Sequence, residues 1–249
     1  MNLPTSSRDK SILMGLYLSK FDNDGLVELG LGSFTEAFNL IGFALGVRPA
    51  SIKNYRDEFD PLFPNPRKGW HKRSMRPNCK AILDAYSGLS QQDFARIIKT
   101  TVYKHHEFGL LAEEAETKIG DNTSFAKRLV TGQAAENYFT SRYQEIDPFK
   151  GLVLEDKTML GCGFDFRLLS ADLDYAVEVK GLNDSTGSIS MTPKEYAVAS
   201  ILRDRYFLVV VKNFRDVPSH QYFQDPVFRG PKFEKTERHF TQVNWLANV

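Results

Sequence analysis

The chain has 249 residues, of which 42% are hydrophobic and 25% charged, and its formal net charge is +1. These values are typical of a folded globular protein of one large or two small domains, and they argue against a disordered or collagen-like chain. The two cysteines, Cys79 and Cys162, lie far apart with no Cys or His at metal-ligand spacing, which argues against a disulfide framework or a zinc finger.

The sequence shows no sign of membrane association. No apolar run approaches the roughly 18 residues needed to span a bilayer. The first fifteen residues also lack the basic, apolar and small-residue pattern of a signal peptide. We therefore expect a cytoplasmic protein with no membrane contact.

Positive charge gathers in one part of the chain. Residues 48–80 contain nine lysines and arginines against three acidic residues. Such an asymmetry predicts a half that faces a polyanion, joined to a half with another role.

The first half is predicted to be helical. In residues 33–45, SFTEAFNLIGFAL, apolar side chains recur at spacings of three and four, with Ser33 as N-cap and Glu36 completing a capping box. Gly46 ends this helix, and a second amphipathic run, ASIKNYRDEFDP, follows at residues 50–61. Two helices joined by a short turn that contains glycine predict a helix-turn-helix.

The second helix of this pair would present polar side chains outward, and RKGWHKR at residues 67–73 adds four cations and a tryptophan. Such side chains suit phosphates and base edges, so we predict that this half binds double-stranded DNA. The alternative is the solvated face of an ordinary helical hairpin, which shows the same periodicity. The predicted DNA contacts are Lys53, Asn54, Arg56, Arg67, Lys68, Trp70, Lys72 and Arg73, with Ser51 also facing outward.

Residues 105–121 are richer in acidic side chains and are predicted to link a helical domain, residues 1–104, to a second domain, residues 122–249. The adjacent His105 and His106 would point in different directions on a helix or strand. We therefore expect a linker or surface role for them rather than a metal site.

The second domain is predicted to alternate helix and strand. Thr192 as N-cap, Pro193 at the first helical position and Glu195 at the third mark the start of one helix. The full order predicts an α/β (α+β) fold, a mixed sheet flanked by helices. The predicted elements are a helix at 125–144, strands at 164–169, 175–179 and 189–191, a helix at 192–205 and a buried strand at 206–214.

Charged side chains lie on or directly beside two of these strands, in the β-rich middle of the predicted α/β domain. Side chains alternate along a strand, so Glu178 and Lys180 share one face. If the strands at 164–169 and 175–179 form a hairpin closed around residues 171–172, Asp165 lies across from Glu178, with Cβ atoms about 4.5–5.5 Å apart. Ala-Asp is not a favoured two-residue turn, so this register is a hypothesis.

Two carboxylates this close repel each other unless a cation lies between them. Mg²⁺, held by a couple of carboxylates and several waters, suits such a site. Lys180 beside it would orient an attacking water and offset the charge that builds up during phosphodiester hydrolysis. The alternative is an ordinary surface ion pair between Lys180 and one of the carboxylates.

Four segments carry a resemblance to a known family: GxGFD, VEVKG and MTPKEY, followed by YFLVVV. Together they resemble the PD-(D/E)XK nuclease superfamily, and within it the restriction-endonuclease-like domain at the C-terminus of bacterial defence proteins and of the plant protein NO VEIN. The resemblance covers residues 125 to about 215, although Phe164 stands where the superfamily has its proline. It implies that a glutamate on the first helix can join the metal site, and Glu136 matches that position.

The residues and the resemblance together predict a Mg²⁺-dependent endonuclease for double-stranded DNA, of the restriction-enzyme type. Asp165 and Glu178 would hold the metal with the Val179 carbonyl and Glu136 as further ligands, while Lys180 would serve the nucleophilic water. A two-fold homodimer would present a site to each strand of the duplex. The alternatives are a non-catalytic DNA-binding regulator or scaffold, and a nuclease for RNA or branched DNA.

Overall fold

The structure is a computed structural model that describes residues 3–69, 73–102 and 122–237. The predicted linker, with His105 and His106, and the predicted DNA contacts Trp70 and Lys72 lie outside the described residues. Within the described part, no helix is both long and apolar enough to cross a membrane.

The N-terminal region is helical, as predicted. Its central helix is α1, which packs against α3, α4 and α5 and is therefore buried on several sides. The helices are α1 (Ser7–Glu28), α2 (Phe34–Ala44), α3 (Pro49–Phe59), α4 (Pro77–Tyr86) and α5 (Gln91–Val102), with a 3-10 turn (Asp60–Leu62) after α3.

The predicted pair of helices around Gly46 is present as α2 and α3. The Ser33 hydroxyl accepts a hydrogen bond from the Glu36 backbone N–H at 3.1 Å, which confirms the N-cap. The Glu36 carboxylate accepts from the backbone N–H of Gly32 at 2.8 Å, one residue before the position that a capping box requires. Gly46 ends α2 with a φ of +65°, a conformation that favours glycine.

The prediction that Arg56 faces outward is wrong. Its side chain is only 9% exposed, because its guanidinium group pairs with Asp57 at 2.7 Å and lies 4.9 Å from the ring centres of Phe34 and Phe38. Lys53 and Asn54, on the same helix, are exposed as predicted.

Other arginines of the basic segment are also paired inside the helical region. Arg67 donates hydrogen bonds to the fully buried carboxylate of Asp60 at 2.8 and 2.9 Å. Arg73 donates to buried Glu58 at 3.0 Å. Lys68 is exposed. Much of the local positive charge is therefore offset by acidic partners within the fold.

The second region is a mixed five-stranded sheet with helices on it, which confirms the predicted fold class. The strands lie in the order β1-β2-β3-β4-β5, and β3 and β4 are parallel while the other neighbours are antiparallel. The elements are α7 (Asn122–Arg142), β1 (Val153–Asp156), β2 (Phe166–Leu169), β3 (Asp174–Gly181), α8 (Pro193–Leu202), β4 (Tyr206–Lys212), β5 (Ser219–Gln224) and α9 (Pro226–Arg229), with 3-10 turns at Tyr143–Glu145, Asp147–Phe149, Thr158–Leu160 and Arg203–Arg205.

The predicted strand at 189–191 is absent from this sheet. Residues 189–191 form irregular chain between β3 and α8. Both edges of β3 are already paired, with β2 on one side and β4 on the other, so the segment has no neighbouring edge to join. Met191 instead packs into the small cluster under α8.

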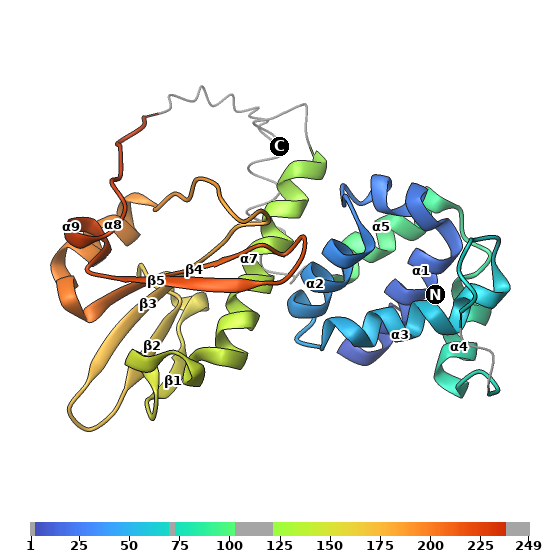
Figure 1. Ribbon diagram of the computed structural model, residues 1–249, viewed down its shortest axis with the longest axis horizontal. Coiled ribbons are helices and arrows are strands. Elements are labelled where there is room, and N and C mark those ends of the chain that lie inside the picture. The colour runs from blue at the N-terminus through green and yellow to red at the C-terminus, as the bar shows by residue number, and fades with distance from the viewer. Residues whose placement is uncertain (1–2, 70–72, 103–121, 238–249) are drawn as a thin grey trace, which may run out of the picture.

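The two faces of the sheet differ in what covers them. Val177 and Val179 point into the main core together with residues of α7, whereas Ala176 belongs to a small cluster with Ala199 of α8 and Tyr206 of β4. The next residues of the same parity, Glu178 and Lys180, therefore face α8. Figure 1 shows α7 between the sheet and the helical region.

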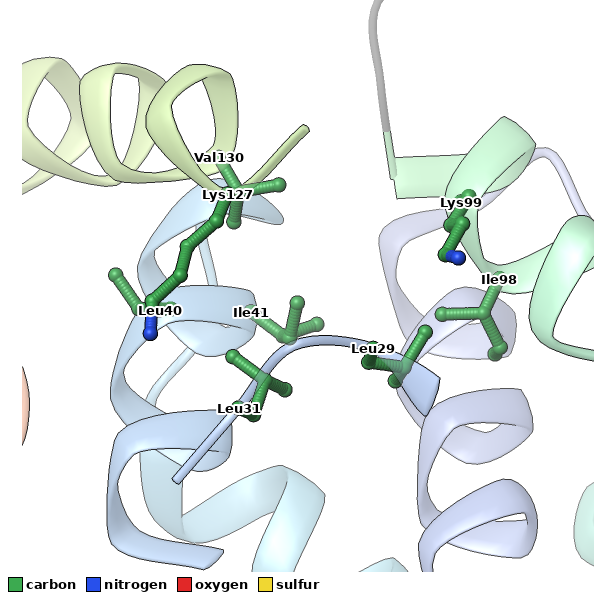
Figure 2. A pocket seen from close by; sticks show the side chains of 8 residues that line it. All are labelled: Leu29, Leu31, Leu40, Ile41, Ile98, Lys99, Lys127 and Val130. Atoms are coloured by element: carbon green, nitrogen blue, oxygen red, sulfur yellow. The ribbon is translucent and has the colours of Figure 1, made fainter. Parts of the chain in front are cut away.

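The helical region and α7 share one continuous core. Figure 2 shows the side chain of Lys127 running from α7 past Leu40 of α2, beside a mostly apolar pocket. The Lys127 ammonium group pairs with the buried Glu36 carboxylate at 2.5 Å. Asn137 of α7 donates to the Phe43 carbonyl at 2.9 Å. The helical region and the sheet region therefore pack together through α7.

Substituting alanine for two glycines near this junction should change stability in opposite directions. A Cβ on Gly181 would lie 2.6 Å from the Thr131 carbonyl oxygen, so Gly181→Ala must push α7 away from β3 and lower the free energy of unfolding by about 1–3 kcal/mol. A Cβ on Gly132, inside α7, meets nothing within 4 Å, so Gly132→Ala should raise it by up to about 1 kcal/mol. Denaturant unfolding of both variants checks this, and two shifts of the same sign would contradict the packing described.

Candidate active site

The register of β2 and β3 places Asp165 next to Glu178. Phe166 pairs with Val177 and Arg167 with Ala176, so the hairpin closes around residues 171–172 as predicted. The backbone N–H of Asp165 continues the pairing by donating to the Val177 carbonyl at 3.0 Å. The register hypothesis is confirmed.

The carboxylate of Asp165 turns toward β3. It accepts a hydrogen bond from the Val179 backbone N–H at 2.8 Å. This contact holds the side chain against the strand that carries Glu178 and Lys180.

Lys180 lies between two carboxylates. Its ammonium group donates to Glu178 at 2.5 Å and to Glu195 at 2.9 Å. Glu195 is in the first turn of α8 and also accepts from the backbone N–H of Thr192 at 2.8 Å, which completes the capping box of that helix. One glutamate thus fixes both the start of α8 and the position of Lys180.

Glu195 was not predicted as a site residue. The sequence pattern of Thr192, Pro193 and Glu195 predicts a helix start, and the structure confirms it. That pattern accounts for Glu195 without a second role. Its contact with Lys180 depends on the packing of α8 over β3, which no local sequence pattern predicts.

Burial raises the pKa of both candidate metal ligands. Glu178 has a side chain that is 4% exposed, and both its burial and the nearby charge of Asp165 raise its pKa. Burial likewise raises the pKa of Asp165, against the lowering effects of the Val179 N–H and of Lys180. Without a bound cation, both carboxyl groups therefore keep their protons to a higher pH than free carboxyl groups do.

Lys180 shows the opposite balance. Burial alone would lower its pKa, but the charges of Glu178 and Glu195 outweigh burial and raise it. The side chain therefore stays a protonated ammonium group at neutral pH. It is suited to donate hydrogen bonds and to stabilise negative charge, and it is unsuited to act as a base.

The donor set fits a hard divalent cation. Asp165, directly before β2, and Glu178, on β3, offer carboxylate oxygens. Carboxylate is the ligand type that Mg²⁺ takes from proteins, with waters completing its shell. A positive charge between these two buried carboxylates would also relieve their mutual repulsion and favour their ionised forms.

Glu136 does not join this set. It lies on α7, which packs on the face of the sheet opposite Glu178. Among the described residues, no group of three or more His, Cys, Asp or Glu side chains is placed to hold a metal ion. The structure therefore corrects the expectation of Glu136 as a ligand, and the Val179 carbonyl stays a prediction.

The comparison with protein families adds one finding. Residues 135–223 match the family model described as Protein NO VEIN, C-terminal. The matched segment runs from α7 to β5 and contains Asp165, Glu178, Lys180 and Glu195, while the helical region lies outside it. Neither the curated proteins nor the solved structures include a match to the chain.

The raised pKa of Glu178 predicts how the stability of the metal-free protein depends on pH. When a glutamate has a higher pKa in the folded state than in the unfolded state, the folded protein loses stability as pH rises above the unfolded pKa of about 4.3. In metal-free protein, Glu178→Gln should therefore raise the free energy of unfolding by about 1–4 kcal/mol at pH 8. The gain should shrink toward zero as pH falls to about 4.

Glu58 in the helical region is the matched control of opposite sign. Burial alone would raise its pKa, but hydrogen bonds from Arg76 and Arg73 outweigh burial and lower it to about 2. Glu58→Gln should cost about 2–3 kcal/mol at pH 7, and the loss should disappear as pH falls from about 4.5 to 2. Thermal unfolding in EDTA across this pH range measures both variants. Equal pH dependence in the two would contradict the assignment of Glu178.

Proposed function

We propose that the protein is a Mg²⁺-dependent endonuclease that hydrolyses phosphodiester bonds of double-stranded DNA. The observation that carries this proposal is the ammonium group of Lys180, held between Glu178 and Glu195, with Asp165 directly before the neighbouring strand β2. The match to the NO VEIN C-terminal family supports a shared domain type and leaves the activity to be tested.

The arrangement is unfavourable as a purely structural feature. Buried carboxylates lose hydration, and a nearby like charge adds to the loss, as the raised pKa values of Asp165 and Glu178 show. A surface ion pair, the alternative considered above, does not describe Glu178, because its side chain is buried. Strongly shifted groups gathered at one place are typical of functional sites.

Asp165 and Glu178 would hold the Mg²⁺, which when bound neutralises phosphate charge and promotes ionisation of water. Lys180, as an ammonium group, would hydrogen-bond to the attacking water or to a phosphate oxygen and stabilise the charge of the transition state. Glu195 would keep Lys180 in place. The reaction consumes one water, breaks one P–O ester bond and yields a phosphate monoester and a hydroxyl group.

The exposed face of the helical region would contact the duplex. Lys53, Asn54 and Lys68 are exposed there, and Lys53 also pairs with Asp57 at 2.7 Å, while the arginines of the basic segment have acidic partners inside the fold. DNA contact through this face, cleavage as a restriction enzyme and a two-fold homodimer with two sites belong to the same proposal.

The rival proposal is a DNA-binding regulator whose nuclease-like region is not catalytic. The intact set of Asp165, Glu178 and Lys180 favours the enzyme, because the loss of any one of them is the simplest route to an inactive domain. Binding without cleavage would favour the regulator.

Cleavage of supercoiled plasmid DNA tests the proposal. With Mg²⁺ the full chain should nick or linearise methylated or unmethylated plasmid, and EDTA should stop it. Asp165→Asn, Glu178→Gln and Lys180→Ala should each lower the rate by at least about 100-fold, because each removes a group acting on the transition-state charge.

Glu155→Gln is the control, since Glu155 is a partly exposed glutamate on the edge strand β1 that pairs with Lys157 at 3.0 Å. It should leave cleavage within about twofold, as expected for an exposed ion pair. Undiminished cutting by the Lys180 variant, or cutting that persists in EDTA, would remove the site assignment.

Alanine variants of two exposed residues of the helical region should weaken DNA binding in two different ways. Lys68→Ala should weaken binding to all duplexes and reduce the slope of log affinity against log salt by about one. Asn54→Ala should cost roughly 1–3 kcal/mol on a specific duplex and leave random duplexes almost unchanged. Titrations of both variants against specific and random duplexes measure this. An equal loss on both duplexes for Asn54→Ala would place base reading elsewhere.

A further inference from the structure

A pair of arginines meets one buried carboxylate where α8 ends and α9 begins. Arg203 follows the last residue of α8, and Arg229 is the last residue of α9. The Nε atom of Arg203 lies 3.3 Å from Asp225 Oδ2, and the Nε atom of Arg229 lies 3.8 Å from the same oxygen. Figure 1 shows α8 and α9 together at one end of the sheet region, and the two helices are in contact.

The cluster is unequal in its burial. The side chain of Asp225 is 2% exposed, whereas those of Arg203 and Arg229 are 49% and 72% exposed. Both arginines approach the carboxylate most closely through Nε. The terminal amino groups, which carry most of the N–H donors of a guanidinium group, are therefore farther from Asp225 than Nε is.

The backbone at this point is held in an unusual conformation. Arg203 has a φ of +57° and Asp225 a φ of +53°, in a region that favours glycine. The guanidinium group of Arg203 also lies 3.6 Å from the ring centre of Phe228, which fixes the plane of the group. Strained non-glycine positions tend to occur at ligand clamps and active sites.

The charges of the cluster do not cancel. One carboxylate faces two guanidinium groups, so the cluster carries an excess positive charge at an exposed surface. Asp225 Oδ1 is buried and accepts no hydrogen bond from the residues that the structure describes. The carboxylate thus retains capacity to accept further N–H groups from either arginine and so to hold both in place.

We propose that Arg203 and Arg229 form a clamp for phosphodiester groups of a nucleic-acid backbone and that Asp225 orients them. The clamp rests on the proposed function in that its ligand is the substrate of the site around Lys180. Planar guanidinium groups present paired N–H donors that match phosphate oxygens.

The position of the clamp suits a substrate that extends past the active site. Arg203 lies eight residues after Glu195 along α8 and the turn that follows it. At about 1.5 Å per helical residue this separation is roughly 12 Å. It corresponds to about three or four steps of about 3.4 Å along a duplex. The clamp would therefore hold the backbone a few nucleotides from the bond that is cut.

Binding of fluorescent duplex DNA to the full chain in EDTA, over a series of salt concentrations, tests the clamp without cleavage. The double variant Arg203→Ala/Arg229→Ala should bind at least about tenfold more weakly than the wild type, since two charge-assisted hydrogen-bonding groups are lost. Its salt slope should fall by about two.

Arg142→Ala is the matched control. Arg142 also pairs with a carboxylate, Glu145, and lies over a ring, that of Tyr138, but it is the last residue of α7, on the other side of the sheet. Its variant should bind like the wild type. If it loses as much affinity as the double variant, the effect is general to exposed arginines and the clamp is overturned.

A double lysine variant tests whether the planar guanidinium geometry matters beyond the positive charge. It also keeps the proposal testable if the alanine variant misfolds. Arg203→Lys/Arg229→Lys keeps both charges but lacks the planar fork. It should recover the wild-type salt slope and only part of the affinity, with an unchanged thermal unfolding midpoint. Full recovery of affinity would mean that positive charge alone explains the binding, and it would overturn the clamp.

The remaining outcomes separate the clamp from the nuclease proposal. Wild-type binding that depends on both arginines, with no cleavage after Mg²⁺ is added, supports the clamp and rejects the nuclease. Cleavage with binding that is the same in the double alanine variant rejects the clamp and leaves the nuclease. Failure of the wild type to bind duplex DNA at low salt rejects the clamp.

Discussion

Lys180 donates hydrogen bonds to Glu178 at 2.5 Å and to Glu195 at 2.9 Å, and so joins the third strand of the sheet to the first turn of α8. Removing this ammonium group would leave buried Glu178 beside Asp165 without its positive neighbour, a state that a low-dielectric interior penalises strongly. The same contact keeps Lys180 charged and limits it to hydrogen-bond donation. The position of α8, the protonation of the site and the chemistry open to it therefore depend on one side chain.

The fold holds this contact through connections on both faces of the sheet. The parallel pairing of β3 with β4 requires a crossover, and α8 supplies it and covers the face that carries Glu178 and Lys180. The opposite face packs against α7, where Gly181 allows the close approach of the Thr131 carbonyl. Since α7 also packs against α2, the helical region and the site-bearing sheet are parts of one core.

Local patterns predicted the parts of the site that lie along one hairpin. Strand alternation predicts that Glu178 and Lys180 share one face, and the predicted register, which the structure confirms, places Asp165 next to Glu178. Features that depend on distant partners were not predictable in this way. Arg56 has the spacing of an outward residue, yet Asp57 and two phenylalanine rings bury it. The polar run of β5 became a strand only because the edge of β4 was open to it.

Metal binding linked to proton release is the most direct test that the carboxylates form a metal site. Calorimetric titration of the full chain with Mn²⁺ at pH 7, in two buffers of different ionisation enthalpy, reports both affinity and released protons. Because burial raises the pKa of Asp165 and Glu178, binding should release protons and should weaken as pH falls. The Asp165→Asn/Glu178→Gln variant should neither bind the ion nor release protons. Equal binding by the wild type and this variant, or no binding by either, would contradict the account.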